Sequence, residues 1–390
     1  MSISNSVKKA LLRDSFMANL YAQADVSRKT GASIYDLTLE YPKLEPPQSF
    51  DRELKKLFAI PQTGMHRYME NAGFTDTRTA IAERLKKESG LDFSMAEVIM
   101  TSGASGAMNM AFKALLNPGE EVILFSPIAY DYRAYVENHA GICRILPSGP
   151  EFLPTGALLE RAINAKTKMV VINSPNNPSG VVYPDTLLKA FADIISQRSA
   201  QLNTRIYIVS DDSFRKFYYG DSVCPWIVKD YPHSIIVGSY SKELSIPGER
   251  IGYTVVNPLC EDAKMVVGGL IHANRTLGFV NAPALMQNVV RALQGQHVDL
   301  VGLRQKRDYL LQNLQRIGYL VRKPEGAFFL LPQTPVTNDI EYVETLAKSG
   351  ILAIPGSFFE APGHMRLSFC VDQSVLEGAI AGLSTAFEKR

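Results

Sequence analysis

The sequence has few cysteines and no long apolar run. Its four cysteines, Cys143, Cys224, Cys260 and Cys370, are widely separated, with no C-x-x-C pair and no histidine at metal-ligand spacing. This pattern predicts free thiols in a reducing compartment, without a disulfide or a metal site. No apolar run approaches the ~18 residues of a membrane span, and the N-terminal residues lack a signal-peptide core. We therefore expect a cytoplasmic protein with no membrane partner.

The sequence also has little excess charge of either sign. Its 41 Lys and Arg residues and 39 Asp and Glu residues give a net charge of +2, and the two signs are interspersed without a basic block. Nucleic acids and anionic membranes are recognised through clustered basic residues, so both are poor candidates for a partner. A small-molecule partner is favoured.

The chain does have the length and the apolar content for a large core. With 390 residues, 46% of them hydrophobic, it is expected to form two domains. Short apolar runs alternate with helical patterns beyond residue 91, which favours an α/β domain with a mostly parallel sheet covered on both faces. In such sheets ligands bind beyond the carboxyl ends of the strands. We expect these strands near 97–101, 121–125, 143–146, 169–173, 205–210, 234–239 and 251–256.

The two ends of the chain have other patterns. Residues 1–30 are predicted to form an arm or a short helix, and the alternation of apolar and polar residues over 34–42 predicts a half-buried strand. From about residue 285 the pattern is helical, with short strands expected near 327–331 and 365–369.

One lysine lies in a frame of hydroxyls directly after the apolar run 234–238. Ser239 and Ser241 flank it, and Arg250 follows before the next strand. A Schiff-base lysine needs a neutral, desolvated amine, while a phosphate-bearing cofactor needs a guanidinium and small hydroxyl donors. Lys242 is therefore a candidate for such a lysine, against the alternative of a lysine on a solvated turn.

Small residues after the first expected strand form a second candidate site. Gly103, Ala104 and Ser105 lead into an apolar helix. A helix N-terminus with free N–H groups and a hydroxyl binds anions, so Ala104 and Ser105 can hold a phosphate. A plain tight turn explains the same residues equally well.

The segment 239–253 resembles the S-x-S-K-x-x-x-x-x-G-x-R-x-G signature of the class I/II aminotransferases, pyridoxal phosphate enzymes of fold type I similar to aspartate aminotransferase. Six motifs in the family order extend this resemblance from about residue 34 to the end of the chain. The resemblance implies a large domain over 50–283 with a mostly parallel sheet flanked by helices. It also implies a smaller α+β domain from 1–49, with the N-terminal arm, and 284–390.

The resemblance implies a role for each motif. Lys242 would bind pyridoxal 5'-phosphate and move the proton of the substrate's Cα, while Ser239, Ser241 and Arg250 would complete the phosphate site. Asp211, at a strand end where a lone buried carboxylate is costly, would pair with the pyridine nitrogen, and Asp212 would be its solvated neighbour.

Further motifs place the substrate and the rest of the cofactor. Asn177, in a string that otherwise reads as a turn, would donate to the phenolic oxygen of the cofactor, and Arg366 would grip the substrate's α-carboxylate in a two-pronged bond. Tyr130 would stack on the pyridine ring, although the family spacing falls on Ala129, and Tyr132 is the other alternative.

Tyr68 resembles the family tyrosine that reaches the cofactor phosphate of a neighbouring subunit. The resemblance therefore implies a homodimer with shared active sites. For Tyr68 alone, ordinary half-buried packing is as good an explanation.

Two residues depart from the family pattern. Glu40 stands where the family usually has glycine in the substrate pocket, and Phe214 stands where it usually has a tyrosine that donates to the cofactor. Glu40 could favour a cationic substrate side chain, whereas Arg275 could favour a second carboxylate. The sequence leaves the substrate side chain open.

The expected activity is amino transfer between an L-amino acid and a 2-oxo acid. The alternative is another pyridoxal phosphate reaction at the same carbon, as in a decarboxylase, a lyase or an oxidase-type enzyme of a biosynthetic pathway. A ligand-sensing module of a transcription regulator shares the fold but needs an attached DNA-binding domain, which makes it the least favoured reading.

Overall fold

The computed structural model describes residues 3–29, 31–60, 63–149 and 151–388. For some residues of its first helix it describes the backbone alone.

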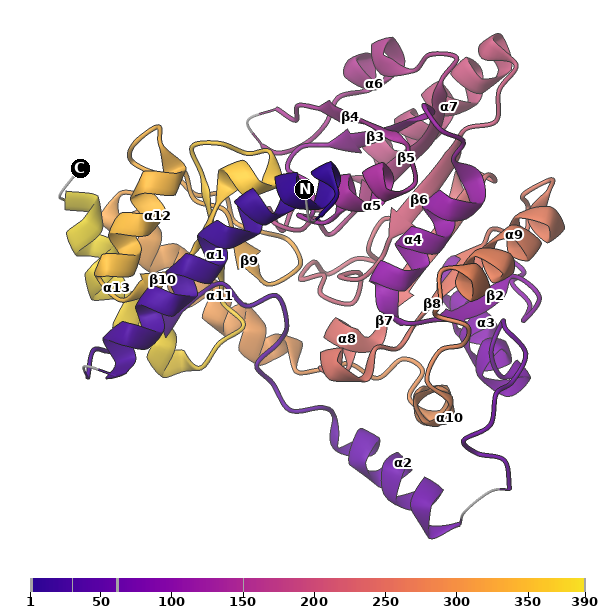
Figure 1. Ribbon diagram of the computed structural model, residues 1–390, viewed down its shortest axis with the longest axis horizontal. Coiled ribbons are helices and arrows are strands. Elements are labelled where there is room, and N and C mark those ends of the chain that lie inside the picture. Colours follow the sequence, from indigo (N-terminus) through magenta and orange to yellow (C-terminus); the bar gives the residue numbers. More distant parts are fainter. Residues whose placement is uncertain (1–2, 30, 61–62, 150, 389–390) are drawn as a thin grey trace.

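A seven-stranded sheet forms the centre of the larger part, with the strand order β2-β8-β7-β6-β5-β3-β4 (Figure 1). Neighbouring strands are parallel except around β8, which is antiparallel to both β2 and β7. The predicted mostly parallel sheet is confirmed. Its strands are β2 (Val98–Thr101), β3 (Glu121–Phe125), β4 (Ile142–Leu146), β5 (Thr167–Asn173), β6 (Tyr207–Asp211), β7 (Ser234–Ser239) and β8 (Gly252–Val256).

Helices cover both faces of this sheet because its strands are apolar on both faces. In β7, Ile235 and Val237 pack into the core formed with α4 and α9, while Ile236 packs into the opposite core, formed with α3, α7 and α10. Successive side chains of a strand point to opposite faces, so a continuous apolar run buries both. The helices of this part are α2 (Gln48–Ala59), α3 (Thr75–Ser89), α4 (Gly103–Leu115), α5 (Tyr132–Asn138), α6 (Gly156–Ala162), α7 (Asp185–Leu202), α8 (Tyr240–Glu243), α9 (Ala263–Thr276) and α10 (Ala284–Ala292).

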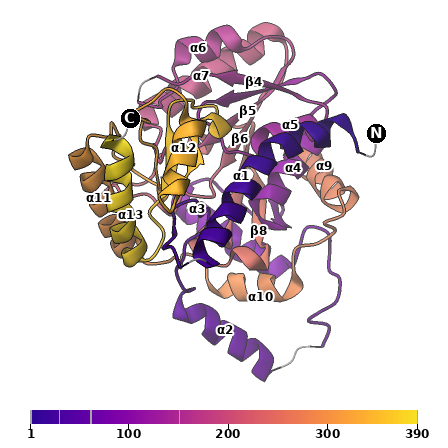
Figure 2. The same cartoon turned by 60° about the vertical axis from the view of Figure 1, so that its left-hand side comes forward.

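The smaller part has its own core around two small sheets, with orders β11-β12-β9 and β1-β10. Leu37, Phe328 and Leu367 are fully buried there, and Leu20 from the N-terminal helix joins them. Figure 2 shows this helix running diagonally across the front of the molecule, beside α12. Its elements are α1 (Asn5–Lys29), β1 (Tyr35–Asp36), α11 (Leu300–Ile317), β9 (Phe329–Leu330), α12 (Asp339–Lys348), β10 (Ile351–Leu352), β11 (Ile354–Pro355), β12 (Met365–Ser368) and α13 (Gln373–Glu388).

The N-terminal segment differs most from the sequence-based expectation. The helix α1 has 25 residues, so it is longer than the predicted arm or short helix. The strand expected over 34–42 has only 2 residues, because just Tyr35 and Asp36 pair with β10 and the chain then passes over the end of the large sheet. The domain division at residues 49 and 283 stays a prediction; α10 shares the core of the large sheet.

The return from β7 to β8 brings two loops very close together. Gly252 pairs with Ser239, and a Cβ added to Gly252 would lie 2.6 Å from the carbonyl oxygen of Gly238 and 2.9 Å from the Cα of Gly103. Gly103 itself has φ +73°, and a Cβ there would meet Arg250 at 2.8 Å. The last glycine of the lysine motif therefore allows this motif to lie against the start of α4.

This close approach predicts different effects for two glycines of one motif. Gly252→Ala should destabilise the protein by about 1–3 kcal/mol, because a methyl group is forced against backbone atoms. Gly248→Ala is the control, since a Cβ there meets nothing within 4 Å, and its effect should stay within about 0.5 kcal/mol. Thermal unfolding of both variants measures this, and equal midpoints would contradict it.

Candidate active site

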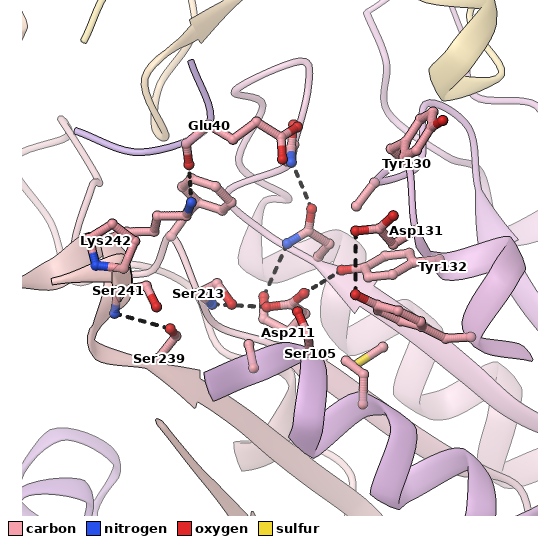
Figure 3. A pocket seen from close by; sticks show the side chains of 18 of the residues that line it. Glu40, Ser105, Tyr130, Asp131, Tyr132, Asp211, Ser213, Ser239, Ser241 and Lys242 are labelled. Carbon is pink, nitrogen blue, oxygen red and sulfur yellow. Dashed lines mark hydrogen bonds between the residues drawn. The ribbon is translucent and has the colours of Figure 1, made fainter. Parts of the chain in front are cut away.

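A cavity of about 160 Å³ lies beyond the carboxyl ends of β5, β6 and β7 (Figure 3). Segments far apart in the sequence line it, and they include most of the residues that the motifs single out. These are Glu40, Ala104, Ser105, Tyr130, Asn177, Asp211, Ser239, Ser241, Lys242 and Arg250.

One end of the cavity is built to hold an anion. The Ser239 hydroxyl caps α8 by accepting the N–H of Ser241 at 3.1 Å, and Arg250 Nη1 donates to the Ser241 hydroxyl at 3.4 Å. Ala104 and Ser105 line the same cavity from the first turn of α4. A guanidinium, hydroxyls and a helix N-terminus thus converge where a phosphate is expected.

Asp211 ends β6 and both of its carboxylate oxygens are held. The Tyr132 hydroxyl donates to Oδ2 at 2.5 Å, and the Ser213 N–H donates to Oδ1 at 3.0 Å. Burial, and then the charge of Asp211, raise the pKa of Tyr132 well above its usual value, so Tyr132 stays a donor. In Figure 3 the Asp211 carboxylate faces the cavity between Tyr132 and Ser213.

The neighbouring Asp212 is not solvated, so that prediction was wrong. Its side chain is buried, and its Oδ1 accepts the Ser210 hydroxyl at 2.7 Å. Burial raises the pKa of Asp212 to about 6. The alternation of side chains along a strand explains the error, because Asp212 points away from Asp211 into the packed protein.

Lys242 enters the cavity from α8, opposite Asp211 in Figure 3. Its Nζ donates to the backbone carbonyl of Glu40. Burial lowers the pKa of Lys242 to about 8; the Glu40 carboxylate opposes this effect, and the positive charges of Arg366 and Arg250 add to it. The neutral amine that a nucleophilic lysine requires is therefore far more populated near neutral pH than in an ordinary lysine, although the protonated form still predominates at pH 7.

Arg366 is fully buried at the edge of this site. Its Nη1 donates to Glu40 Oε1 at 2.6 Å and to Asn177 Oδ1 at 3.0 Å, and its Nη2 donates to the Thr38 carbonyl at 2.9 Å. The rings of Phe329 and Phe359 lie 4.4 and 4.8 Å from its guanidinium carbon. No residue pattern had indicated the roles of Thr38 and of the two phenylalanines, because their approach depends on the folded chain.

The two tyrosines that follow Ala129 lie in different places. Tyr132 is buried beneath Asp211, whereas Tyr130 is half-buried, donates its hydroxyl to Asp14 of α1 and lies 6.1 Å from the Phe358 ring. Ala129 lines the same cavity. The stacking role of Tyr130 stays a prediction.

A second cavity, of about 450 Å³, adjoins the first, and Glu40 and Tyr130 line both. Its other walls come from α1, from the segment after β1 and from residues 354–359. The near-helical spacing of the apolar residues of α1 predicted a helix but gave no signal that it forms a cavity wall.

Several residues singled out from the sequence are not among those that line the two cavities: Gly103, Arg366, Tyr68 and Arg275. Tyr68 is 86% exposed, and Arg275 lies on the exposed side of α9. Phe214 does line the first cavity, where its ring packs against Phe328 and Phe329.

Other expectations concern metals, thiols and membranes. All four cysteines are free thiols. In the described part of the chain, one group of potential metal ligands, His233, Cys260 and Asp262, lies together, but Asp262 already accepts Arg205 at 2.8 Å and Tyr207 at 2.7 Å. Among the described residues no helix is long and apolar enough to cross a membrane.

The residues present fit pyridoxal phosphate by their chemistry. The cavity offers hydroxyls and the Arg250 guanidinium for a phosphate, an ionisable carboxylate held by Tyr132 for a pyridine nitrogen, and the amine of Lys242 between them. Each group of the cofactor would thus meet a partner of matching charge or hydrogen-bonding capacity.

Comparisons with known proteins agree with this geometry. The family model "Aminotransferase class I and II" matches residues 33–383. A probable aspartate/prephenate aminotransferase of Thermus aquaticus is 31% identical, covering 99% of both chains, and an asparagine–oxo-acid transaminase of Streptococcus mutans is 26% identical, covering 94% of this chain and 95% of that one. The crystal structure of an aminotransferase from Eubacterium rectale superposes with a TM-score of 0.94 at 30% identity, covering 100% of this chain and 99% of that one.

Fold and cavity together define a pyridoxal phosphate-dependent enzyme of fold type I. The chain belongs to the class I and II aminotransferase family. It is an aminotransferase, which moves an amino group between an L-amino acid and a 2-oxo acid.

The lowered pKa of Lys242 can be measured directly in protein freed of cofactor. A brief pulse of acetic anhydride modifies only neutral amines, so acetylation of Lys242 should reach half its maximal rate near pH 8, against the ordinary lysine value of 10.5. Peptide mass spectrometry across a pH series gives the profile, and Lys242→Ala shows that the peptide is assigned correctly. A midpoint near 10.5 would mean that the amine is solvated.

Proposed function

We propose that Lys242 carries the cofactor and that Asp211, Asn177 and Arg366 complete one active site in this cavity. The observation that supports this most is that Lys242, whose pKa is lowered, lines the same cavity as the Asp211 carboxylate. The serine hydroxyls and the Arg250 guanidinium line it too. Ser105, Ser239, Ser241 and Arg250 would hold the phosphate.

Bound pyridoxal phosphate supplies a ring that accepts the electron pair left when a bond at the substrate's Cα breaks. Asp211 would pair with the pyridine nitrogen, and its carboxylate oxygens are held in place by the Tyr132 hydroxyl and the Ser213 N–H, which both donate to them. Lys242 Nζ would take the proton from the substrate's Cα and hold it until it is returned, a role that a lysine pKa lowered to about 8 suits. Arg366 orients the substrate through its α-carboxylate.

The identity of the cofactor lysine can be tested by chemical trapping. Borohydride reduction of the holoenzyme followed by peptide mapping should place the cofactor on Lys242. Lys242→Arg should then lose the label and nearly all amino transfer, because an arginine side chain cannot be neutral at neutral pH. A label on any other lysine would refute the assignment.

We also propose that the protein is a homodimer with shared active sites and that it works in the cytoplasm. The segment from α2 to the following loop carries large exposed apolar side chains, with Phe58 57%, Ile60 74% and Tyr68 86% exposed. In Figure 1, α2 stands away from the rest of the protein. Exposed apolar groups of this kind mark an interface, and a second copy of this chain is the partner the family pattern implies. The four free thiols support a reducing compartment.

The dimer can be tested by mixing two damaged subunits. Tyr68→Phe should weaken cofactor binding roughly tenfold or more by removing one hydrogen bond to the phosphate. In a hybrid with a Lys242→Ala subunit, one site combines an intact Lys242 with an intact Tyr68 of the neighbouring chain. Cofactor titration of tagged, purified hybrids should therefore recover one site of normal affinity per dimer.

Two outcomes would contradict this arrangement. Sedimentation of the holoenzyme as a fully active monomer would exclude shared sites. Recovery of no normal site in the hybrid would place Tyr68 in its own subunit's site.

Another reaction at the same carbon is the alternative, and Phe214 is the observation that favours it. Its ring lines the cavity among other phenylalanines, so the hydroxyl donor of the family is missing there. Measuring 2-oxo acid, transferred amino groups and free ammonia separately distinguishes amino transfer from oxidase-type or lyase chemistry.

A further inference from the structure

The guanidinium proposed for the substrate's α-carboxylate already holds a carboxylate of the protein. Glu40 Oε1 lies 2.6 Å from Arg366 Nη1. Burial raises the pKa of the Glu40 carboxyl, but Arg366 outweighs this effect and the net pKa is below its usual value. Glu40 is therefore negatively charged at neutral pH, and an incoming α-carboxylate must compete with it.

Of the two partners, Glu40 is the one that can move. Arg366 is 0% exposed, lies between the rings of Phe329 and Phe359 and is fixed by the Thr38 carbonyl. The Glu40 side chain is 51% exposed and opens onto the cavity, on a segment with no regular secondary structure. A substrate carboxylate that takes Nη1 thus displaces Glu40 from an arginine that stays in place.

Displacement leaves a charge imbalance that depends on the substrate. Arg366 contributes +1, Glu40 −1 and the α-carboxylate −1. A cationic side chain on the substrate brings this group of charges to zero, a neutral one leaves −1 and a carboxylate leaves −2. In a site of low dielectric constant each uncompensated charge is costly, so the cationic substrate is favoured.

The second cavity is the space in which the displaced Glu40 and the substrate side chain can meet. Glu40 and Tyr130 line both cavities. Asp14, bonded to Tyr130, also lines the second cavity, and no basic side chain is among the described residues that line it. Its other walls are mainly apolar and aromatic, including Met17, Leu39 and Phe358, which suits an alkyl stem.

We propose that the enzyme takes α-amino acids with a cationic side chain, and that Glu40 selects them by leaving Arg366 and pairing with the substrate's cation. This inference rests on the proposed function, since it assumes that Arg366 binds the α-carboxylate. Glu40 is a specificity-determining residue that the α-carboxylate displaces from Arg366, and dicarboxylic amino acids are disfavoured.

Three unreactive ligands of equal chain length test the charge preference in the holoenzyme. They are 5-guanidinopentanoate, heptanoate and heptanedioate, which differ only in a positive, neutral or negative far end and lack an α-amino group. Calorimetric titration should give the tightest binding for 5-guanidinopentanoate and the weakest for heptanedioate. The ratio of their dissociation constants should be about tenfold to a hundredfold.

Two variants show whether Glu40 sets this preference. Glu40→Gln keeps the size of the side chain and removes its charge. It should weaken the binding of 5-guanidinopentanoate, strengthen the binding of heptanoate and heptanedioate, and abolish most of the ratio of their affinities. Glu45→Gln makes the same change at an exposed residue of the same segment that lines neither cavity, and it should leave the ratio as it is. A Glu40→Gln variant with an unchanged ratio, or a wild-type protein that prefers heptanedioate, would overturn the inference.

A parallel screen of amino acids separates this inference from the proposed function. Amino transfer from arginine or lysine ahead of leucine and aspartate supports both. Transfer from aspartate ahead of arginine and lysine overturns the inference and leaves the proposed function standing. Absence of transfer from every amino acid would contradict the proposed function itself, and with it the inference.

Discussion

Parallel pairing of β5, β6 and β7 fixes where the chemistry of this protein can occur. Asn173 pairs with Asp211 and Asp211 with Val237, so the three strands end at one edge of the sheet and release their next residues into one space. The residues that follow them are the asparagine string, the carboxylate and the lysine motif. Their convergence needs no long side chains or special loops, because the register of the sheet brings them together.

Charges within this space are each held by a specific partner. Asp211 is held by Tyr132 and a backbone N–H, Arg366 by Glu40, and Arg250 by a hydroxyl and backbone oxygens of the loops that meet at Gly252. Lys242 donates to a carbonyl and is surrounded by both signs of charge, so burial dominates and its amine loses the proton readily. The same burial that stabilises the fold therefore sets the reactivity of the site.

The pairing of Arg366 with Glu40 joins two segments of the smaller part that are distant in the sequence. Arg366 belongs to β12, and its partner Glu40, which follows β1, lines the cavity at the end of the large sheet. The helix α1 forms one wall of the second cavity, and its Asp14 accepts a hydrogen bond from Tyr130. A substrate that displaced Glu40 from Arg366 would therefore change contacts that hold both ends of the chain beside the large sheet. The relatives reported above are named for different amino acids, so the family does not determine which side chain fits this space.

The sequence by itself determined the strands of the large sheet, the order of the motifs and many of the residues that line the cavity. It could do so because a buried strand needs a continuous apolar run and each functional residue lies within a few positions of a strand end. Only the tertiary structure decided that Asp212 is buried, that Tyr132 holds Asp211 while Tyr130 meets α1, and that Glu40 binds Arg366. The last two residues are 326 positions apart. Local patterns carry no information on such a distance, because that contact exists only when both parts of the chain have packed against the same edge of the sheet.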